Sequence, residues 1–292
     1  MMRPTGDRTL SASLISGAPA LRERHPTLFL PAWRSRLIVS TGIGLAVGVY
    51  ILALVVLEFS PARILGGLGQ LGDIVRLMLP PDPGTWSRFV LYAHSLAETL
   101  AIAFLGTLSA ALLALPVGFF AAKNVVANRI VHALSRRGLD AIRGIDTLVW
   151  ALIWINVVGL GPFAGVLAIM TSDVGAFGKL FSEAIETADR KPVDGIVSTG
   201  GAHAHGVRFG ILPQVLPVIA SQVLYYFESN TRSATIIGIV GAGGIGLHLS
   251  EQIRTLEWQQ VSFLVVMILI AVAVIDLVSS RLRFAIIGTT SR

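Results

Sequence analysis

The sequence predicts an all-α integral membrane protein with about six transmembrane helices, and three observations predict it. Of the 292 residues, 53% are hydrophobic and only 14% are charged, whereas soluble domains carry about a quarter charged residues. The mean hydropathy is +0.74. Several uncharged runs reach the length of about 20 residues that a helix needs to cross a bilayer. The composition therefore points to a chain whose main solvent is lipid.

The chain begins with a basic segment that precedes the first apolar run. That run starts near Leu37, much farther from Met1 than the apolar core of a cleavable signal peptide would. No such signal is therefore evident. We expect residues 1–36 to form a basic cytoplasmic tail and residues 37–292 to form the transmembrane domain.

The apolar runs define the expected spans, which are 37–57, 99–122, 139–158, 162–181, 209–227 and 259–281. The third and fourth are separated at Gly159–Pro162, which interrupts an otherwise uncharged run. This division leaves Asp140, Arg143 and Asp146 in the first turns of the third helix.

Residues 209–250 are interpreted as one helix broken at Glu228–Arg232 and followed by a glycine-rich stretch, 233–250. The pattern does not decide whether that stretch spans the membrane or re-enters it. Irregular backbone at membrane depth is tolerated only where protein or water covers it. We therefore expect the stretch to face a cavity.

The distribution of Lys and Arg selects the topology. With six spans and both termini in the cytoplasm, the inner segments hold 18 of these residues, the outer segments hold four, and Arg232 lies inside a span. Five spans would give 12 inside and 10 outside, and seven would give 16 and six. Because inner loops carry the excess of positive charge, six spans are expected.

The outer loop 58–90 is then long enough to contain a short amphipathic helix. Its apolar residues from Ile64 to Leu77 recur at helical spacing.

Several motifs that suggest chemistry lack the context that it needs. Two G-x-G-x-x-G stretches begin at Gly67 and Gly241, but neither follows a strand, so we interpret their glycines as small residues that let helices approach. The P-loop motif and cysteine are both absent, and His203 and His205 have no further ligands beside them. We expect no catalytic residue, no metal site, no cofactor and no nucleic-acid partner.

The loop 183–213 carries a functional pattern. It reads as a short helix, a glycine turn at Gly200–Gly201, a second short helix, and Leu212-Pro213 opening the next span. This pattern resembles the EAA loop of bacterial ABC-importer permeases. Asp194-Gly195-Ile196 takes the Glu-Ala-Ala place and Gly200 takes the glycine, whereas Gly210 stands where the motif has isoleucine. A solvated connector is the alternative interpretation.

The resemblance extends over roughly the last two-thirds of the chain and is specific to the phosphonate permease branch. The stretches that carry it are 148–168, 210–217 and 227–246. It implies a type I ABC importer fold like that of the methionine permease. It also implies a homodimer in the bacterial cytoplasmic membrane that works with two ATPase subunits and an extracytoplasmic phosphonate-binding protein. This assembly would import phosphonate or a related small phosphorus oxyanion.

In the family that it resembles, the EAA loop forms a coupling helix that docks on the ATPase. ATP would be hydrolysed by that partner, and the chain itself would do no covalent chemistry. The residues expected at this docking surface are Asp194, Gly195, Gly200, Gly201 and Arg208.

Charged residues also lie at membrane depth. Glu228 and Arg232 are spaced i, i+4 in the favourable order, which fits a structural pair. Because charge in a bilayer is costly and faces the bundle or a wet cavity, the pair fits a polar lining for an anion equally well. The residues expected to line the translocation path are Glu228, Asn230, Arg232, Ser233 and Thr235.

Three other functions stay open as alternatives. An ion-coupled secondary carrier predicts an internal repeat of the spans, and none is seen. An intramembrane enzyme needs a convergent catalytic set at membrane depth. An ABC permease for another substrate class would share the same loop.

Overall fold

The computed structural model describes residues 32–125 and 128–288. Most of the expected basic tail, residues 1–31, therefore lies outside the described residues. The chain divides into two compact units, Met1–Leu71 and Gly72–Arg292. The first unit contains helix α2 (Ala32–Val56), which carries the first expected span. Helix α3 (Pro61–Leu77) follows where an amphipathic helix was predicted.

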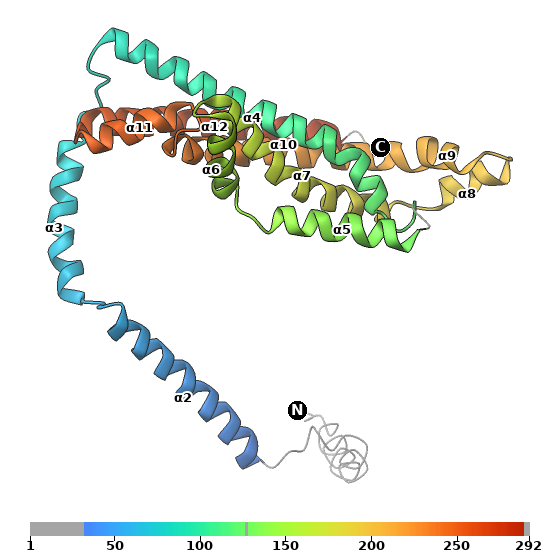
Figure 1. Cartoon of the computed structure of the whole chain (residues 1–292), viewed down its shortest axis with the longest axis horizontal. Helices are drawn as coiled ribbons and strands as arrows, with labels where there is room; N and C mark the ends of the chain where they lie inside the picture. The colour runs from blue at the N-terminus through green and yellow to red at the C-terminus, as the bar shows by residue number, and fades with distance from the viewer. Residues whose placement is uncertain (1–31, 126–127, 289–292) are drawn as a thin grey trace, which may run out of the picture. The chain divides into compact units, whose positions relative to one another are not determined.

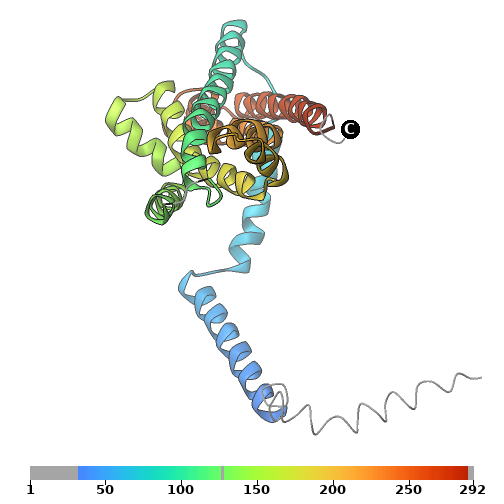
Figure 2. The ribbon, with the colours of Figure 1, turned by 90° about the vertical axis from the view of Figure 1, so that its right-hand side faces the viewer.

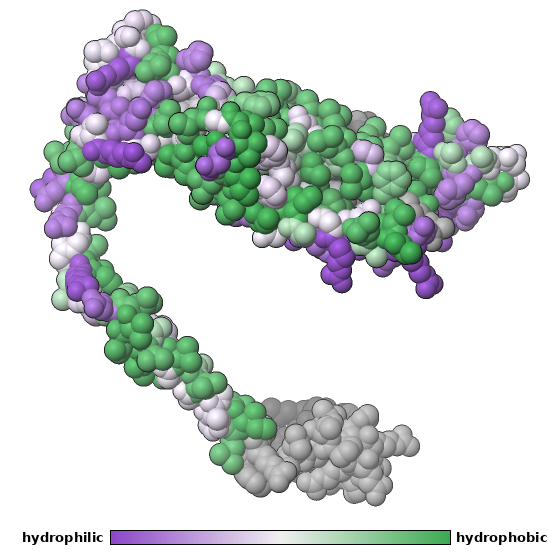
Figure 3. Space-filling view, viewed as in Figure 1, coloured by the Kyte–Doolittle hydropathy of each residue, from purple (hydrophilic) through white to green (hydrophobic). Residues whose placement is uncertain are grey.

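The second unit is a bundle in which every regular element of the described residues is a helix (Figure 1). Its long helices are α4 (Trp86–Ala121), α7 (Pro162–Thr187), α10 (Leu212–Ile239) and α12 (Trp258–Gly288). Seen from the end that carries α8 (Lys191–Ser198) and α9 (His203–His205), α12 lies on the opposite side of the bundle from α5 (Arg129–Arg143) and α6 (Thr147–Val158) (Figure 2). The face shown in Figure 3 has an apolar middle and polar residues at both ends of the bundle, as a membrane protein requires.

Helix α4 begins 13 residues before the predicted span 99–122, so the outer loop is shorter than predicted. The Thr85 side chain caps the helix by accepting a hydrogen bond from the Arg88 backbone N–H. The charges of Arg88 and Glu98 ended the uncharged run in the sequence, but they do not end the helix. Span length therefore underestimates helix length wherever a helix continues beyond the bilayer.

Close packing of α4 on α7 forms the centre of the bundle. A Cβ added at Gly106 of α4 would lie 2.7 Å from Ile169 Cβ, and one added at Gly118 would lie 2.9 Å from Phe181 Cβ. Phe177 and Phe181 stack in the core with ring centroids 5.2 Å apart. Small residues on one helix thus receive large residues of the other.

The predicted third span, 139–158, is wrong as a single helix. The structure has α5 (Arg129–Arg143) and α6 (Thr147–Val158), which meet at an angle of 87°. Asp146 lies between them and caps α6 by accepting from the Leu148 N–H. Neither helix alone reaches the roughly 20 residues of a span. Five helices of the described chain are long and apolar enough to cross a membrane, and the bent pair makes a sixth only if it counts as one span.

The predicted break at Glu228–Arg232 is also wrong, because α10 continues through these residues to Ile239. The stretch 233–250 is neither one span nor one re-entrant helix. It contains the end of α10, a turn at Val240–Gly244, and the start of α11 (Ile245–Arg254). The turn packs against α4 and α7: the Thr99 hydroxyl accepts from the Ile245 N–H, and Gly241 O accepts from the Gly161 N–H.

The two G-x-G-x-x-G stretches differ. Gly241, Gly243 and Gly244 all have positive φ, the region that favours glycine, and the backbone of the turn approaches α7 closely. At the first stretch, Gly67, Gly69 and Gly72, an added Cβ would meet no described atom within 4 Å. The prediction of close helix approach is therefore confirmed at the second stretch, and at the first it stays a prediction.

We predict that Gly165→Ala lowers the thermal unfolding midpoint, because its Cβ would lie 2.6 Å from Ala242 O in the glycine turn. Overpacking of this kind costs about 1–3 kcal/mol. The matched control is Gly138→Ala on α5, where an added Cβ meets nothing within 4 Å and alanine favours the helix. Unfolding of the detergent-solubilised protein, followed by tryptophan fluorescence, measures both. Equal midpoints would contradict this packing.

Candidate functional site

The loop that was singled out in the sequence forms a compact unit at one end of the bundle (Figure 1). After α7 ends at Thr187, α8 (Lys191–Ser198) is followed by the short helix α9 (His203–His205) and the π-helical turn η2 (Gly206–Ile211). Gly200 has φ +87°, so the turn between the short helices adopts a conformation that favours glycine. The Gly200 and Gly201 N–H groups donate to Val197 O and Ile196 O and close this turn.

Helix α8 packs on η2 through Val193. A Cβ added at Gly206 would lie 2.9 Å from Val193 Cγ1, and one added at Gly210 would lie 2.8 Å from Val193 Cγ2 and 3.2 Å from its backbone. Isoleucine could not occupy position 210 without moving α8. The departure of Gly210 from the family pattern therefore has a physical reason, namely the close approach of these two helices.

Gln214 fixes the loop to the first turn of α10. Its Oε1 accepts from the Asp189 N–H at 3.0 Å, and its Nε2 donates to Asp189 O at 3.1 Å. At the end of α7, the Glu186 carboxylate accepts from the Lys123 N–H at 2.8 Å and pairs with Arg136 of α5 at 3.0 Å. These bonds join the segment before α8 to α10, and the end of α7 to α5 and to Lys123.

Most of the residues expected at the docking surface are accessible. Asp194, Gly195, Gly200 and Arg208 are exposed and Gly201 is half-buried. The Arg208 guanidinium lies 5.3 Å from the centroid of the Phe209 ring, and Val197 is an exposed apolar residue on α8. The loop offers polar, charged and apolar groups on one surface, as a protein-binding surface does.

Inside the bundle, Glu228 lies between two arginines. Its Oε1 is 3.7 Å from Arg232 Nη1 and its Oε2 is 3.1 Å from Arg283 Nη2. Arg283 comes from α12, 55 residues farther along the chain. The predicted Glu228–Arg232 pair is therefore present as one side of a three-residue cluster. The cluster carries two positive charges against one negative charge.

Asn230 belongs to a second cluster that is buried. Its Nδ2 donates to Asp173 Oδ2 of α7 at 2.5 Å and to Thr107 Oγ1 of α4 at 2.8 Å. The exposed fractions of the three residues are 5%, 5% and 1% in that order. These bonds join α4, α7 and α10 at one level of the bundle.

Ser233 and Thr235 bond to their own helix. The Ser233 hydroxyl donates to Ser229 O at 3.5 Å, and the buried Thr235 hydroxyl donates to Thr231 O at 3.2 Å. The five residues expected along the path therefore fall into three groups. Glu228 and Arg232 belong to the ion cluster and Asn230 to the buried network, whereas Ser233 and Thr235 donate to carbonyl groups of their own helix. Sequence reasoning did not identify Arg283, Thr107 or Asp173 as site residues, because their partners come from distant helices.

The loop histidines form no metal site with their neighbours. His205 Nδ1 accepts from the Ala202 N–H at 3.2 Å, and both His203 and His205 are exposed. Within the described ranges, no group of three or more His, Cys, Asp or Glu side chains could hold a metal ion.

Known proteins resemble this chain along most of its length. The family model described as "Binding-protein-dependent transport system inner membrane component" matches residues 114–288. HtxC of Stutzerimonas stutzeri is 41% identical over 76% of this chain and 78% of its own length. PtxC of the same species, named a phosphite transport system permease protein, is 35% identical over 75% and 79%. The phosphate-import permease protein PhnE of Mycolicibacterium smegmatis is 32% identical over 82% of this chain and 45% of its own length.

The fold also has a solved counterpart. A chain from an inward-facing structure of the MetNI methionine ABC transporter superposes with a TM-score of 0.60 and 18% identity, over 69% of this chain and 99% of that one. At this identity the likeness concerns the fold alone. The predicted methionine-permease-like fold is thereby confirmed.

Proposed function

Because this chain belongs to the family of binding-protein-dependent transport system inner membrane components, we propose that it is the membrane-spanning subunit of an ATP-driven importer for phosphonate or a related small phosphorus oxyanion. One observation carries the substrate class. The Glu228 carboxylate in the span His203–Ile239 is shared by Arg232 of the same span and Arg283 of the span Trp258–Ile286. An unbalanced positive charge within membrane spans favours an anion. The names of PtxC and PhnE, a phosphite and a phosphate permease, support the same class.

We propose a homodimer, and the surface that one chain leaves open supports it. The Arg232 side chain is 51% exposed within a membrane span. Exposure of a guanidinium to lipid is costly, so it faces a water-filled cavity or another protein surface. A second copy packed against the face of α10 that carries Arg232 would enclose the cluster of Glu228, Arg232 and Arg283 in a polar path. Both chain ends would lie in the cytoplasm, on the side of α8.

The loop between α7 and α10 would dock on the ATPase, with Asp194, Gly195, Gly200, Gly201 and Arg208 at or beside the contact. ATP-driven closure of two ATPase subunits would displace α8, and the Gln214 clamp would pass this motion to α10. The extracytoplasmic binding protein would deliver the oxyanion to the opposite end of the bundle. The phosphorus chemistry of the substrate would stay unchanged during transport.

The test is ATP hydrolysis by the chain reconstituted in lipid with its ATPase and binding protein, challenged with methylphosphonate, phosphite, phosphate, methionine and histidine. The proposal expects stimulation by a phosphorus oxyanion. Stimulation by an amino acid alone would indicate an ABC permease of another substrate class. The absence of any complex with an ATPase, from folded protein, would instead support a secondary carrier.

We predict that Gly200→Val abolishes stimulated ATP hydrolysis and leaves only the basal rate. The native φ of +87° is a region in which a β-branched residue is strongly disfavoured, so α8 would lose its orientation on η2. Gly200→Asn is the matched control, because asparagine tolerates positive φ better than other residues. The two variants are compared by phosphate release. Equal activities would show that this turn does not set the coupling.

A further inference from the structure

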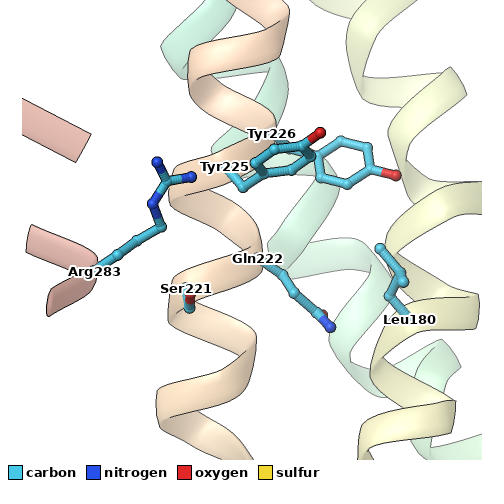
Figure 4. Close-up of a pocket in the computed structure, with 6 residues that line it drawn as sticks. All are labelled: Leu180, Ser221, Gln222, Tyr225, Tyr226 and Arg283. Carbon is cyan, nitrogen blue, oxygen red and sulfur yellow. The ribbon is translucent and has the colours of Figure 1, made fainter. Parts of the chain in front are cut away.

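Exposed apolar and aromatic side chains have different meanings at different levels of the bundle. Within the spans, lipid or a second copy of the chain covers them. The groove over α10, which Figure 4 shows between Arg283 of α12 and Leu180 of α7, is an example, because its Tyr225 is 56% exposed. Beyond the bilayer such a side chain meets water. A single one there needs no explanation unless a second feature distinguishes it.

Leu256, between α11 and α12, is an apolar residue beyond the bilayer, and its exposed fraction is 66%. Helix α11, which it follows, lies at the end of the bundle opposite to α8 and α9 (Figure 1). The Tyr92 hydroxyl of α4 donates to Gln260 Oε1 at 2.8 Å, so the start of α12 is level with Tyr92. Tyr92 precedes the uncharged run of α4, which begins at Thr99, by seven residues, or about 10 Å of helix. The corner at Leu256 therefore lies outside the expected bilayer.

The backbone of Leu256 is held in a conformation that leucine disfavours. Its φ is +60°. The Leu256 N–H donates to Ile253 O at 3.2 Å, and the Glu257 N–H donates to Gln252 O at 3.0 Å, which is the hydrogen-bond pattern of a Schellman motif. Glycine, and less often asparagine, is the usual residue at the left-handed position of this motif, because a Cβ is disfavoured there. The chain thus keeps a leucine where the helix end favours glycine.

Packing within the chain does not account for this leucine. Two-thirds of its surface is exposed, and it is not part of the buried apolar clusters of the described residues. Backbone strain is typical of functional positions, where the side chain must be held in one place. The exposed fraction and the strain together point to a contact with another molecule.

Charged groups flank Leu256. Arg254 and Glu257 are exposed, and within the described ranges no salt bridge within 4.0 Å joins either of them to another residue. An apolar residue between unpaired charges has the composition of a protein contact, in which an apolar centre lies within a polar rim. A partner with a carboxylate opposite Arg254 and a cation opposite Glu257 would be complementary to this corner.

We propose that Leu256 is a contact for the extracytoplasmic binding protein, which receives its side chain in an apolar pocket and pairs with Arg254 and Glu257. The identity of the partner rests on the proposed function, whereas the position, the exposure and the backbone conformation are properties of this chain. In the proposed importer, the ATPase would dock at the opposite end of the bundle and a second copy would lie beside the spans. The binding protein is the component that approaches from the side of Leu256.

Three substitutions separate the side chain from the backbone strain. Leu256→Gly removes the side chain and relieves the strain, Leu256→Asn introduces a polar side chain that tolerates positive φ, and Leu256→Met keeps an apolar side chain of similar size. The thermal midpoint of Leu256→Gly should equal or exceed that of the wild type, since glycine favours this helix end. A loss of docking in this variant is then not a loss of folding.

Docking is measured on the permease–ATPase complex in lipid nanodiscs, with the binding protein loaded with phosphite or with methylphosphonate. The readout is the concentration of binding protein that half-saturates ATP hydrolysis, and fluorescence anisotropy of the labelled binding protein follows the contact directly. We expect Leu256→Gly and Leu256→Asn to raise this concentration at least about tenfold, a change of ~1.4 kcal/mol, and Leu256→Met to raise it less than about threefold.

Arg254→Gln tests the charged rim. It should raise the half-saturating concentration and weaken its dependence on salt, because a charge pair with the partner is lost. The matched control is Arg281→Gln, which changes an exposed arginine near the other end of α12. This control should leave the half-saturating concentration and its salt dependence unchanged.

Several outcomes would overturn this contact. Unchanged docking of Leu256→Gly and Leu256→Asn, or equal weakening by Leu256→Met, would show that the apolar side chain is not bound. A lower thermal midpoint of Leu256→Gly would give the side chain a structural role, and loss of the homodimer with docking unchanged would assign the corner to a contact between copies. If a phosphorus oxyanion stimulates the wild-type complex and the variants behave like it, the contact is wrong and the proposed function stands. If no phosphorus oxyanion stimulates the wild-type complex, the proposed function fails and the contact falls with it.

Discussion

Replacing Glu228 by glutamine should destabilise the protein by about 2–3 kcal/mol, because the change leaves Arg232 and Arg283 without the buried carboxylate that both contact. Breaking a buried ion pair by removing one partner costs roughly 3–5 kcal/mol, and partial exposure of the arginines reduces this figure. For a chain of this size, the thermal midpoint should fall on the order of 5–10 °C. Thermal unfolding of the detergent-solubilised protein measures the effect.

A matched control separates the cluster from ion pairs in general. Glu58→Gln removes the carboxylate of the Glu58–Arg63 pair, whose side chains are 75% and 74% exposed. Exposed pairs contribute about 0–1 kcal/mol, so this midpoint should hardly move. Arg283→Met in the Glu228→Gln background should restore part of the loss, since it removes an unpaired charge. Strictly additive losses would show that Glu228 and Arg283 do not interact.

The local signals of the sequence predicted much of the loop 183–213. Glycines at 200 and 201 and the Leu-Pro pair at 212–213 are local features, and they correspond to the turn and to the first residues of α10. The packing of Val193 on Gly206 and Gly210 was not predictable, because it joins two short helices face to face. The one feature of the sequence that indicated this close packing was glycine in place of isoleucine at position 210.

The membrane helices were predicted in number more reliably than in shape. Hydropathy reports whether a run is apolar, and it carries no information on the 87° bend between α5 and α6. The available signal was Asp146, a helix N-cap placed two residues before Leu148. Conversely, the charges at 228–232 suggested a break in α10. The helix continues because the Glu228 carboxylate pairs with Arg283 of α12. No local sequence pattern can reveal a partner on so distant a helix.

The same reasoning explains why the two polar clusters were not separated in advance. Glu228 and Asn230 are two residues apart, so they lie on different faces of one helix. One face meets α12 and the other meets α4 and α7. Sequence analysis treated them as one lining. Their different partners place Glu228 in an ion cluster with Arg232 and Arg283, and Asn230 in a buried hydrogen-bond network with Asp173 and Thr107.

The second large loss of stability is expected from Asn230→Leu, in the buried network of Asn230, Asp173 and Thr107. Leucine cannot donate to Asp173, so a buried carboxylate that is 5% exposed loses the amide to which it is bonded. A buried charged group left without its hydrogen bond costs about 3 kcal/mol. The thermal midpoint should fall by roughly 6–12 °C. Asn156→Leu is the control, because Asn156 is exposed and, among the described residues, its side chain bonds only to Leu152 O of its own helix.

An exchange of the two side chains tests whether the bond itself is responsible. In the double variant Asp173→Asn with Asn230→Asp, the amide would lie on α7 and the carboxylate on α10, and the donor–acceptor pair would be restored in reverse. The Thr107 hydroxyl, which now donates to Ala103 O and accepts from Asn230, can turn to donate to the new carboxylate. Asn230→Asp alone places two carboxylates side by side and should be at least as harmful as Asn230→Leu. If the exchanged protein unfolds near the wild-type midpoint while both single changes are severely destabilised, the hydrogen bond joins the helices. If the exchange is as unstable as the single changes, the packing shape at this level matters more than the bond.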